Sequence, residues 1–255
     1  EKGVEISVFD DFPDEFISPS IWMHSLRIPE TGDRDYDRAI VRSIESLAKL
    51  MIYAPDRNRH LRSLVAGYPV FPSIFGRDSD ITNMGLVYLD SQLVKENLEF
   101  RLSKLGRRYD LPRAEEPGRA IHEYNIDELT SAGLMNQFPN YIGCDESPLL
   151  GISIARYVRI TGDTSLIKDQ KEKIRHLIDY VLNSTDSNGF ISFKGDLKDK
   201  DGKPLYFTRN HTWRDSDNGV LNPDGSYPEQ PLRTLWDQSA LYGMLVEFLR
   251  IIRSK

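Results

Sequence analysis

The sequence predicts an all-α fold in which helices follow one another in pairs, with a small β-hairpin inserted late in the chain. Three observations support this prediction. Apolar residues recur at intervals of three and four over several long segments, as they do on the buried face of a helix. These segments do not alternate with strand-like segments, which argues against a parallel sheet. The loops between them are unequal in length and rich in polar and aromatic residues, and loops of this kind often carry function.

The start of the chain differs in pattern from the rest. Residues 1–35 are polar, contain three prolines and show no sustained period, which predicts an irregular lead-in. Residues 36–255 show the helical periods and are predicted to form the folded domain. The 255-residue chain is 39% hydrophobic, which is enough to build the buried core of one large domain.

The folded domain is predicted to begin with two helices. The first ends near Tyr53, because the apolar residues of 40–52 form one wide stripe. The second covers residues 81–98, and Asp78 or Ser79 can cap its exposed N–H groups.

A helical hairpin is predicted further along the chain. Residues 148–159 are apolar on nearly every side, as in a helix packed between neighbours. Thr161-Gly162-Asp163 ends this helix, and residues 164–182 resume with a narrower apolar stripe. The short break predicts that the two helices form an antiparallel pair.

The last predicted helix covers residues 241–252 and follows a stretch rich in Gly, Asp and Lys. Within that stretch, residues 189–193 and 204–207 are predicted to be short strands of a hairpin. Residues 199–202 resemble part of a calcium-binding loop. They lack the first ligand and the bidentate glutamate of such a loop, so a turn is the better interpretation.

Composition limits the classes of partner. The net charge is −6 and the basic residues are scattered, so neither nucleic acid nor an anionic membrane surface is an expected partner. The chain has no run of 18 apolar residues, so we expect no membrane span. A single cysteine, Cys144, favours a reducing, cytoplasmic location and excludes a Cys-rich zinc module. No cofactor is predicted, and a neutral or small polar ligand is the better expectation.

Three loops concentrate Trp, Tyr, Asp, Glu or Arg just before a predicted helix. The first, residues 66–79, ends with Arg77 and Asp78. Adjacent Arg and Asp side chains can donate and accept together, which suits the vicinal hydroxyl groups of a sugar. The alternative is a capping aspartate beside a surface arginine.

The second loop contains His122 and Glu123, followed by Asp145. The first two might be zinc ligands, but no second histidine lies three or four residues further on, so a metalloprotease site is not expected. Asp145 and Ser147 are equally consistent with an ordinary helix cap.

The third loop contains Trp213 and Asp215 and leads to Glu229. A carboxyl group beside an indole has the surroundings of a general acid, because an apolar neighbour disfavours the charged form. The alternative is a solvated turn next to a core tryptophan.

Taken in order, these loops resemble the amylo-α-1,6-glucosidase domain of glycogen-debranching enzymes and related six-hairpin, glucoamylase-like glycoside hydrolases. The matching segments are 66–82, 118–124, 141–163 and 213–219. The resemblance covers residues 36–254 and implies an α/α toroid that hydrolyses α-glucosides or related oligosaccharides with inversion.

The resemblance also implies roles for individual residues. Asp215 corresponds to the general acid, and Trp213 to the aromatic residue beside it. Arg77 and Asp78 correspond to the pair that hydrogen-bonds the sugar. The remaining substrate-binding candidates are Tyr68, Phe75, His122, Glu123, Asp145 and Glu229.

Two departures from the family pattern affect these expectations. Val70 stands where a tryptophan is common, and Asp80 replaces an apolar residue. The predicted helices are also too few for a complete toroid. We therefore expect an incomplete toroid, with the general base on a missing segment or on a companion chain; Glu229 and Glu123 are the alternative bases within the chain.

Two other functions are consistent with parts of the sequence. The DDxxD arrangement of residues 10–14 resembles the magnesium diphosphate motif of isoprenoid synthases, but Pro13 opposes the helix that this motif needs. A non-catalytic relative that keeps the sugar pocket as a binding or scaffolding module is the second alternative.

Overall fold

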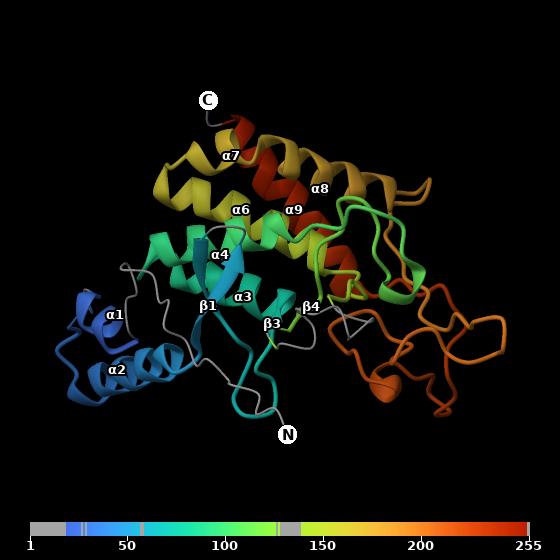
Figure 1. Ribbon diagram of the computed structural model, residues 1–255, viewed down its shortest axis with the longest axis horizontal. Coiled ribbons are helices and arrows are strands. Elements are labelled where there is room, and N and C mark those ends of the chain that lie inside the picture. The colour runs from blue at the N-terminus through green and yellow to red at the C-terminus, as the bar shows by residue number, and fades with distance from the viewer. Residues whose placement is uncertain are drawn as a thin grey trace, which may run out of the picture.

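The computed structural model describes residues 19–26, 28, 30–56, 59–125, 127 and 139–253 (Figure 1). This part of the chain contains eight α-helices, two 3-10 helices and two small two-stranded sheets. The prediction of a mostly α fold is confirmed. The DDxxD motif of residues 10–14 lies outside the described residues.

The predicted irregular lead-in contains a helix, α1 (Pro19–Ser25), so the prediction is wrong for this part. The side chain of Trp22 is buried and its indole N–H donates to Asp90 Oδ2 at 2.7 Å. Helix α2 (Arg34–Ala48) begins where the side chain of Asp33 accepts two backbone N–H groups. A hydrogen bond to Asp90, 68 residues further along the chain, therefore holds a segment that has no helical period of its own.

Helix α2 ends at Ala48, and the residues predicted to continue it form a strand instead. Strands β1 (Met51–Asp56) and β2 (Arg59–Leu64) pair antiparallel, with Met51 opposite Leu64. Arg62 of β2 pairs with Glu96 at 2.8 Å and thereby holds the hairpin against a later helix. Apolar residues are compatible with either a helix or a strand over so short a stretch. Pairing with β2, which Glu96 of α4 holds in place through Arg62, makes this stretch a strand.

The helix predicted at 81–98 is two helices, α3 (Gly76–Leu86) and α4 (Ser91–Ser103). Asp90 separates them, because its side chain accepts the N–H of Leu93 and caps α4. Neither Asp78 nor Ser79 is a cap, since α3 already begins at Gly76.

The start of α3 is held by a second small sheet. Strand β3 (Ile74–Phe75) pairs antiparallel with β4 (Glu123–Tyr124). The 3-10 helix η1 (Leu111–Arg113) lies in the loop that leads to β4. A side chain at Gly76 would overlap the Glu146 carboxylate and the Ile121 carbonyl, so glycine is required where these segments meet.

The predicted helical hairpin is confirmed. Helix α6 (Glu146–Thr161) is buried on most sides and ends at Gly162, whose φ of 70° suits glycine. The second arm is divided into α7 (Ser165–Asp169) and α8 (Lys171–Asn183). The last helix, α9 (Leu235–Arg253), begins earlier than predicted.

The strand pair predicted at 189–193 and 204–207 is wrong. Phe193 makes a single bridge with Leu232, and Pro204 makes one with Lys198. The turn interpretation of residues 199–202 agrees with the structure, because the Asp199 side chain accepts the N–H groups of Asp201 and Lys203. The 3-10 helix η2 (Asp217–Gly219) follows in the same long connection.

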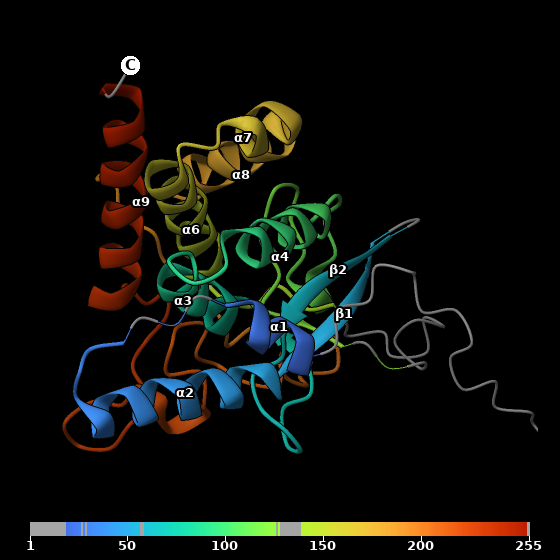
Figure 2. The ribbon, with the colours of Figure 1, turned by 90° about the vertical axis from the view of Figure 1, so that its left-hand side faces the viewer.

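Three helices organise the fold around the loops of interest. Helix α6 lies between α3 and α9 and packs against both, with α7 and α8 beyond it (Figures 1 and 2). The N-terminal ends of α3, α6 and α9 lie together, since Arg77 and Trp236 both contact Asp145. None of the helices in the described ranges is long and apolar enough to cross a membrane.

Candidate active site

Arg77, in the first turn of α3, is the centre of the site. Its Nε and Nη2 donate to the two carboxylate oxygens of Asp145 at 2.7 and 2.9 Å. Asp145 immediately precedes α6 and is fully buried, and the Arg77 side chain is 13% exposed. Two parallel hydrogen bonds between charged groups away from water form a strong and geometrically specific link.

Asp215 reaches the same guanidinium from the third loop. The Arg77 Nη1 atom donates to Asp215 Oδ2 at 3.3 Å, across 138 residues of sequence. The Asp215 side chain is 44% exposed. The turn of residues 213–215 and the start of α3 therefore meet, and Asp215 keeps one side open to solvent.

Two tryptophans complete the exposed side of this cluster. Trp236, in the first turn of α9, donates its indole N–H to Asp145 Oδ2. Trp213 is about half exposed, and its ring lies 6.1 Å from that of Trp236 at an angle of 53°. An aromatic face thus lies next to the turn that carries Asp215.

Asp237, in the first turn of α9, holds the segment before Trp213 through hydrogen bonds. Its Oδ1 accepts from the hydroxyl of Thr212 at 3.0 Å and its Oδ2 from that of Thr234 at 2.7 Å. Asp237 is buried, and this burial raises the pKa of its carboxyl to about 7, with the Asp145 charge acting in the same direction. Because Thr212 precedes Trp213, Asp237 links α9 to the position of that indole.

A second buried layer of charges lies behind Arg77. Glu146 Oε1 accepts a hydrogen bond from His122 Nδ1 at 2.9 Å, and Glu146 Oε2 lies 3.8 Å from Arg101 Nη2. Arg101 Nη1 pairs with Asp80 Oδ2 at 3.1 Å, and burial raises the pKa of Asp80 to about 7. Arg77 Nη2 is 3.8 Å from Glu146 Oε1 and so connects both layers.

The predicted residues divide into two groups. The structure brings Arg77, Asp145, Trp213 and Asp215 into one cluster, with His122 behind them. Among the described contacts, none joins the other candidates to Asp145 or Asp215.

Phe75 packs its edge on the His122 ring, with centroids 5.6 Å apart. Asp78 is exposed and, together with Arg77, lines a cavity of about 240 Å³ beside the end of α2. Glu123 is half-buried, with Asn140 Nδ2 at 3.4 Å, and burial raises the pKa of its carboxyl. Tyr68 and Glu229 are exposed, and the described contacts of the Arg77 cluster include neither of them.

Four residues around Arg77 are not among the candidates that the sequence predicts. Trp236 and Asp237 lie beside the cluster, and Arg101 and Glu146 belong to the layer of charges behind it. Two of them carried a usable signal. Trp236-Asp237 repeats the pairing of an indole with a carboxyl that singled out the third loop. The apolar period predicts that the last helix begins at residue 241, so this pair lies in a segment for which the sequence predicts no element.

The arrangement combines a half-exposed carboxyl, a buried cation and a half-exposed indole. Comparison with known proteins adds no family to this picture. The sequence matches no protein-family model, and no curated protein matches it. Among the described residues, no group of three or more His, Cys, Asp or Glu side chains is arranged to hold a metal ion. The chemistry of the site is therefore argued from its own residues.

Proposed function

We propose that this chain is part of an inverting glycoside hydrolase that acts on α-glucosides or related oligosaccharides, with Asp215 as the general acid. The observation that carries the proposal is the contact of 3.3 Å between Arg77 Nη1 and Asp215 Oδ2. It joins the two loops whose residues suit sugar binding and acid catalysis.

The exposed side of the cluster suits a hydroxylated ring. Trp213 is half-exposed, and the Arg214 guanidinium lies over its ring at 5.0 Å from the centroid. The part of the ring that Arg214 leaves uncovered can pack against the C–H groups of a sugar. Asp215, with its open side, can accept a hydrogen bond from a ligand or donate one to it. Sites for small ligands commonly combine aromatic walls with a few such polar groups.

The geometry of the cluster leaves Asp215 as the carboxyl that a substrate can reach. Asp145 accepts two hydrogen bonds from Arg77 and one from Trp236 and is fully buried, so its oxygens are already occupied. Asp215 contacts the same guanidinium through one longer hydrogen bond of 3.3 Å and is 44% exposed. Of the two acids, Asp215 is therefore the one placed to pass a proton to the leaving oxygen.

Inversion also needs a base that activates water on the opposite face of the sugar, about 6.5–9.5 Å from the acid. Within the described cluster, each buried carboxylate already binds an arginine, a histidine or hydroxyl groups. We therefore place the base outside this chain, on a further segment or a companion chain that also completes an α/α toroid.

The test compares hydrolysis of two α-glucosides by the wild type and by Asp215→Asn. One substrate has a nitrophenolate leaving group, which departs without a proton, and the other has a simple alcohol, which needs one. Loss of the acid should slow release of the alcohol by about 10²–10⁴-fold and release of the nitrophenolate much less.

Asp217→Asn is the matched control, because Asp217 is an exposed residue of the same turn and asparagine keeps the oxygen that accepts the Arg209 N–H. Equal slowing of both substrates by Asp215→Asn, or full activity in that variant, rules out the acid role. Because the base is placed outside this chain, hydrolysis by the wild type alone should be slow but measurable. Calorimetric binding of oligosaccharides with no detectable hydrolysis of either substrate would instead support a binding module.

A further inference from the structure

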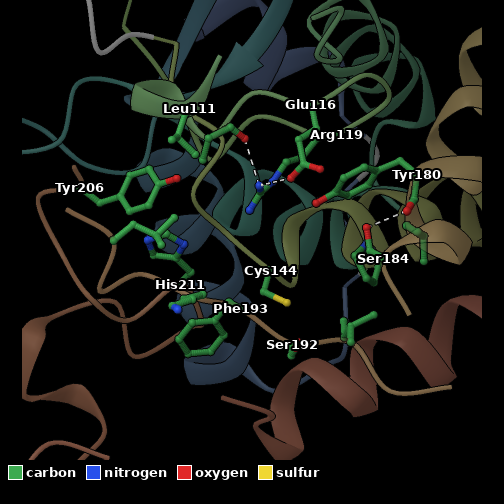
Figure 3. Close-up of a pocket in the computed structure, with 16 residues that line it drawn as sticks. Leu111, Glu116, Arg119, Cys144, Tyr180, Ser184, Ser192, Phe193, Tyr206 and His211 are labelled. Atoms are coloured by element: carbon green, nitrogen blue, oxygen red, sulfur yellow. Dashed lines mark hydrogen bonds and ion pairs between the residues drawn. The ribbon is translucent and has the colours of Figure 1, made fainter. Parts of the chain in front are cut away.

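Two cavities of the protein differ in chemical character. The wall of a cavity of about 320 Å³ contains charged residues, among them Lys194 and the ion pair of Arg119 with Glu116 (Figure 3). A groove of about 450 Å³ lies instead between α3, α6 and α9, and most of the side chains that line it are apolar. Arg77 does not line this groove, although Trp236 does. The groove therefore adjoins the candidate site and differs from it in being mainly apolar.

Helix α9 is apolar on the side that faces away from the protein as well as on the side that packs. Its inner side buries Leu241 and Met244 in an apolar cluster. On other sides of the helix, Leu235, Tyr242 and Ile252 are 84%, 70% and 67% exposed. Figure 2 shows α9 at the left edge of the molecule, where no described segment lies beyond it. Because a helix that is apolar all round is normally buried, this side of α9 has the composition of a surface that another element covers.

The groove and the exposed side of α9 form one apolar surface. Tyr242 belongs to both, and the exposed Ile81 of α3 lies in the opposite wall. Leu149 and Ile152 of α6 line the groove between them. Grooves between helices commonly bind an amphipathic helix, whose apolar residues at intervals of three and four enter the groove. The groove thus has the form and the chemistry of a binding site for a helix.

Positive charge is in excess at one end of the groove. Glu247 is buried and pairs with Arg250 at 2.8 Å and with Arg159 at 3.0 Å, and Arg156 lies 3.8 Å from it. Three arginines share one carboxylate, so these four residues carry two positive charges in excess. Arg156 and Arg250 line the groove and are partly exposed. A helix bound there is expected to carry carboxylates where it passes these arginines.

We propose that the groove between α3, α6 and α9 binds an amphipathic helix whose apolar face covers Ile81 and Tyr242 and whose carboxylates pair with Arg156 and Arg250. The helix belongs to the further segment or companion chain that would supply the general base, so its identity rests on the proposed function. Trp236 lines the groove and also contacts Asp145. One end of the bound helix therefore reaches the Arg77 cluster, where that base is needed.

Synthetic peptides labelled with fluorescein test the binding, which is measured by fluorescence anisotropy on the full chain. The acidic peptide has about 20 residues, which as a helix span about 30 Å, with leucine along one face. It carries glutamates in its first and last turns, so that one acidic turn meets the arginines in either orientation. A second peptide has lysine in place of these glutamates, and a third has the acidic composition in an order without an apolar face.

The acidic peptide should bind the wild type saturably, and the lysine peptide should bind at least about tenfold more weakly, because like charges would then meet. The third peptide should not bind. Equal affinity for the acidic and lysine peptides, or no binding of the acidic peptide, would show that the proposal is wrong.

Substitutions at exposed residues locate the bound peptide. Tyr242→Glu places a charge in the apolar groove and should abolish binding of the acidic peptide. Arg250→Glu removes the excess of positive charge, so the preference for the acidic over the lysine peptide should disappear. Leu182→Glu on α8 is the control, because Leu182 is exposed but does not line the groove, and it should change neither affinity.

Two further outcomes overturn the proposal. Binding that persists unchanged in Tyr242→Glu places the peptide elsewhere on the protein. Sedimentation that shows a dimer for the wild type and a monomer for Tyr242→Glu identifies a second copy of this chain as the occupant. None of these measurements contains a sugar, so their failure leaves the acid role of Asp215 open to its own test, and failure of that role leaves the measured binding unaffected.

Discussion

Arg77 and Asp145 join the first turn of α3 to the start of α6 through two hydrogen bonds of 2.7 and 2.9 Å, and the carboxylate has no exposure to solvent. This pair is the point at which the loops of the candidate site meet. Asp145 accepts a further hydrogen bond from Trp236 of α9, and Arg77 also contacts Asp215. Stability and the geometry of the site therefore depend on the same buried pair.

We predict that Asp145→Asn destabilises the protein by about 3–5 kcal/mol, because it leaves the Arg77 charge buried without its main partner. Urea denaturation measures the free energy of unfolding. Asp215→Asn is the comparison, since Asp215 contacts the same guanidinium but is 44% exposed, and it should cost no more than about 1 kcal/mol. Equal effects of the two substitutions would contradict the central role of the Arg77–Asp145 pair.

Asp237→Asn should change how stability depends on pH. Burial raises the pKa of Asp237 to about 7, so the folded state retains a proton that the unfolded state loses near pH 4. The contribution of this proton to stability is present below about pH 4 and is lost as the pH rises through 7. Asparagine does not ionise, so the variant should gain roughly 1–3 kcal/mol relative to the wild type between pH 4 and pH 8.

Thermal unfolding at a series of pH values measures this trend. The exposed Asp169→Asn substitution on α7 is the control and should show a constant difference from the wild type. A constant difference for Asp237→Asn as well would mean that Asp237 is ionised in the folded state throughout.

His211→Phe should have the opposite dependence on pH. Burial lowers the pKa of His211 to about 3, below the ordinary value near 6.5, so acidification protonates the unfolded state first. The stability contributed by the neutral ring is present above about pH 6.5 and is lost as the pH falls towards 3. The variant should therefore gain stability relative to the wild type as the pH falls from 7 to 4.

Urea titrations at pH 7 and pH 4.5 measure this difference. The control is His24→Gln on α1, where the histidine is exposed and the substitution should have nearly the same effect at both pH values. A loss of relative stability by His211→Phe at the lower pH would contradict a buried neutral imidazole.

Two glycines of α3 should respond in opposite directions to alanine. Gly76→Ala places a methyl group against the Ile121 carbonyl and the Glu146 carboxylate, and should destabilise the protein by about 1–3 kcal/mol or more. Gly85→Ala meets no atom within 4 Å and should stabilise the same helix by about 0.5–1 kcal/mol. Shifts in the melting temperature report both signs, and a stabilising Gly76→Ala would contradict the close packing at the start of α3.

The helical hairpin of α6 to α8 was predicted well because its signals are local. Residues 148–159 are apolar on nearly every side, and Gly162 ends the helix through its own backbone conformation. The strand at 51–56 was missed, because the short apolar stretch has no local preference and becomes a strand through pairing with 59–64. The division between α3 and α4 was also missed, although Asp90 is a good helix cap.

The loops that concentrate carboxyl groups, arginine and indoles can be found from the sequence, because such concentrations are properties of neighbouring residues. Which of these side chains meet depends on how the helices pack. Arg77 finds Asp215 across 138 residues and Trp236 finds Asp145 across 91 residues, whereas Glu229 remains exposed in a neighbouring loop. The physical reason is that a buried charge requires a partner, and helix packing over the whole chain determines which partner lies within reach.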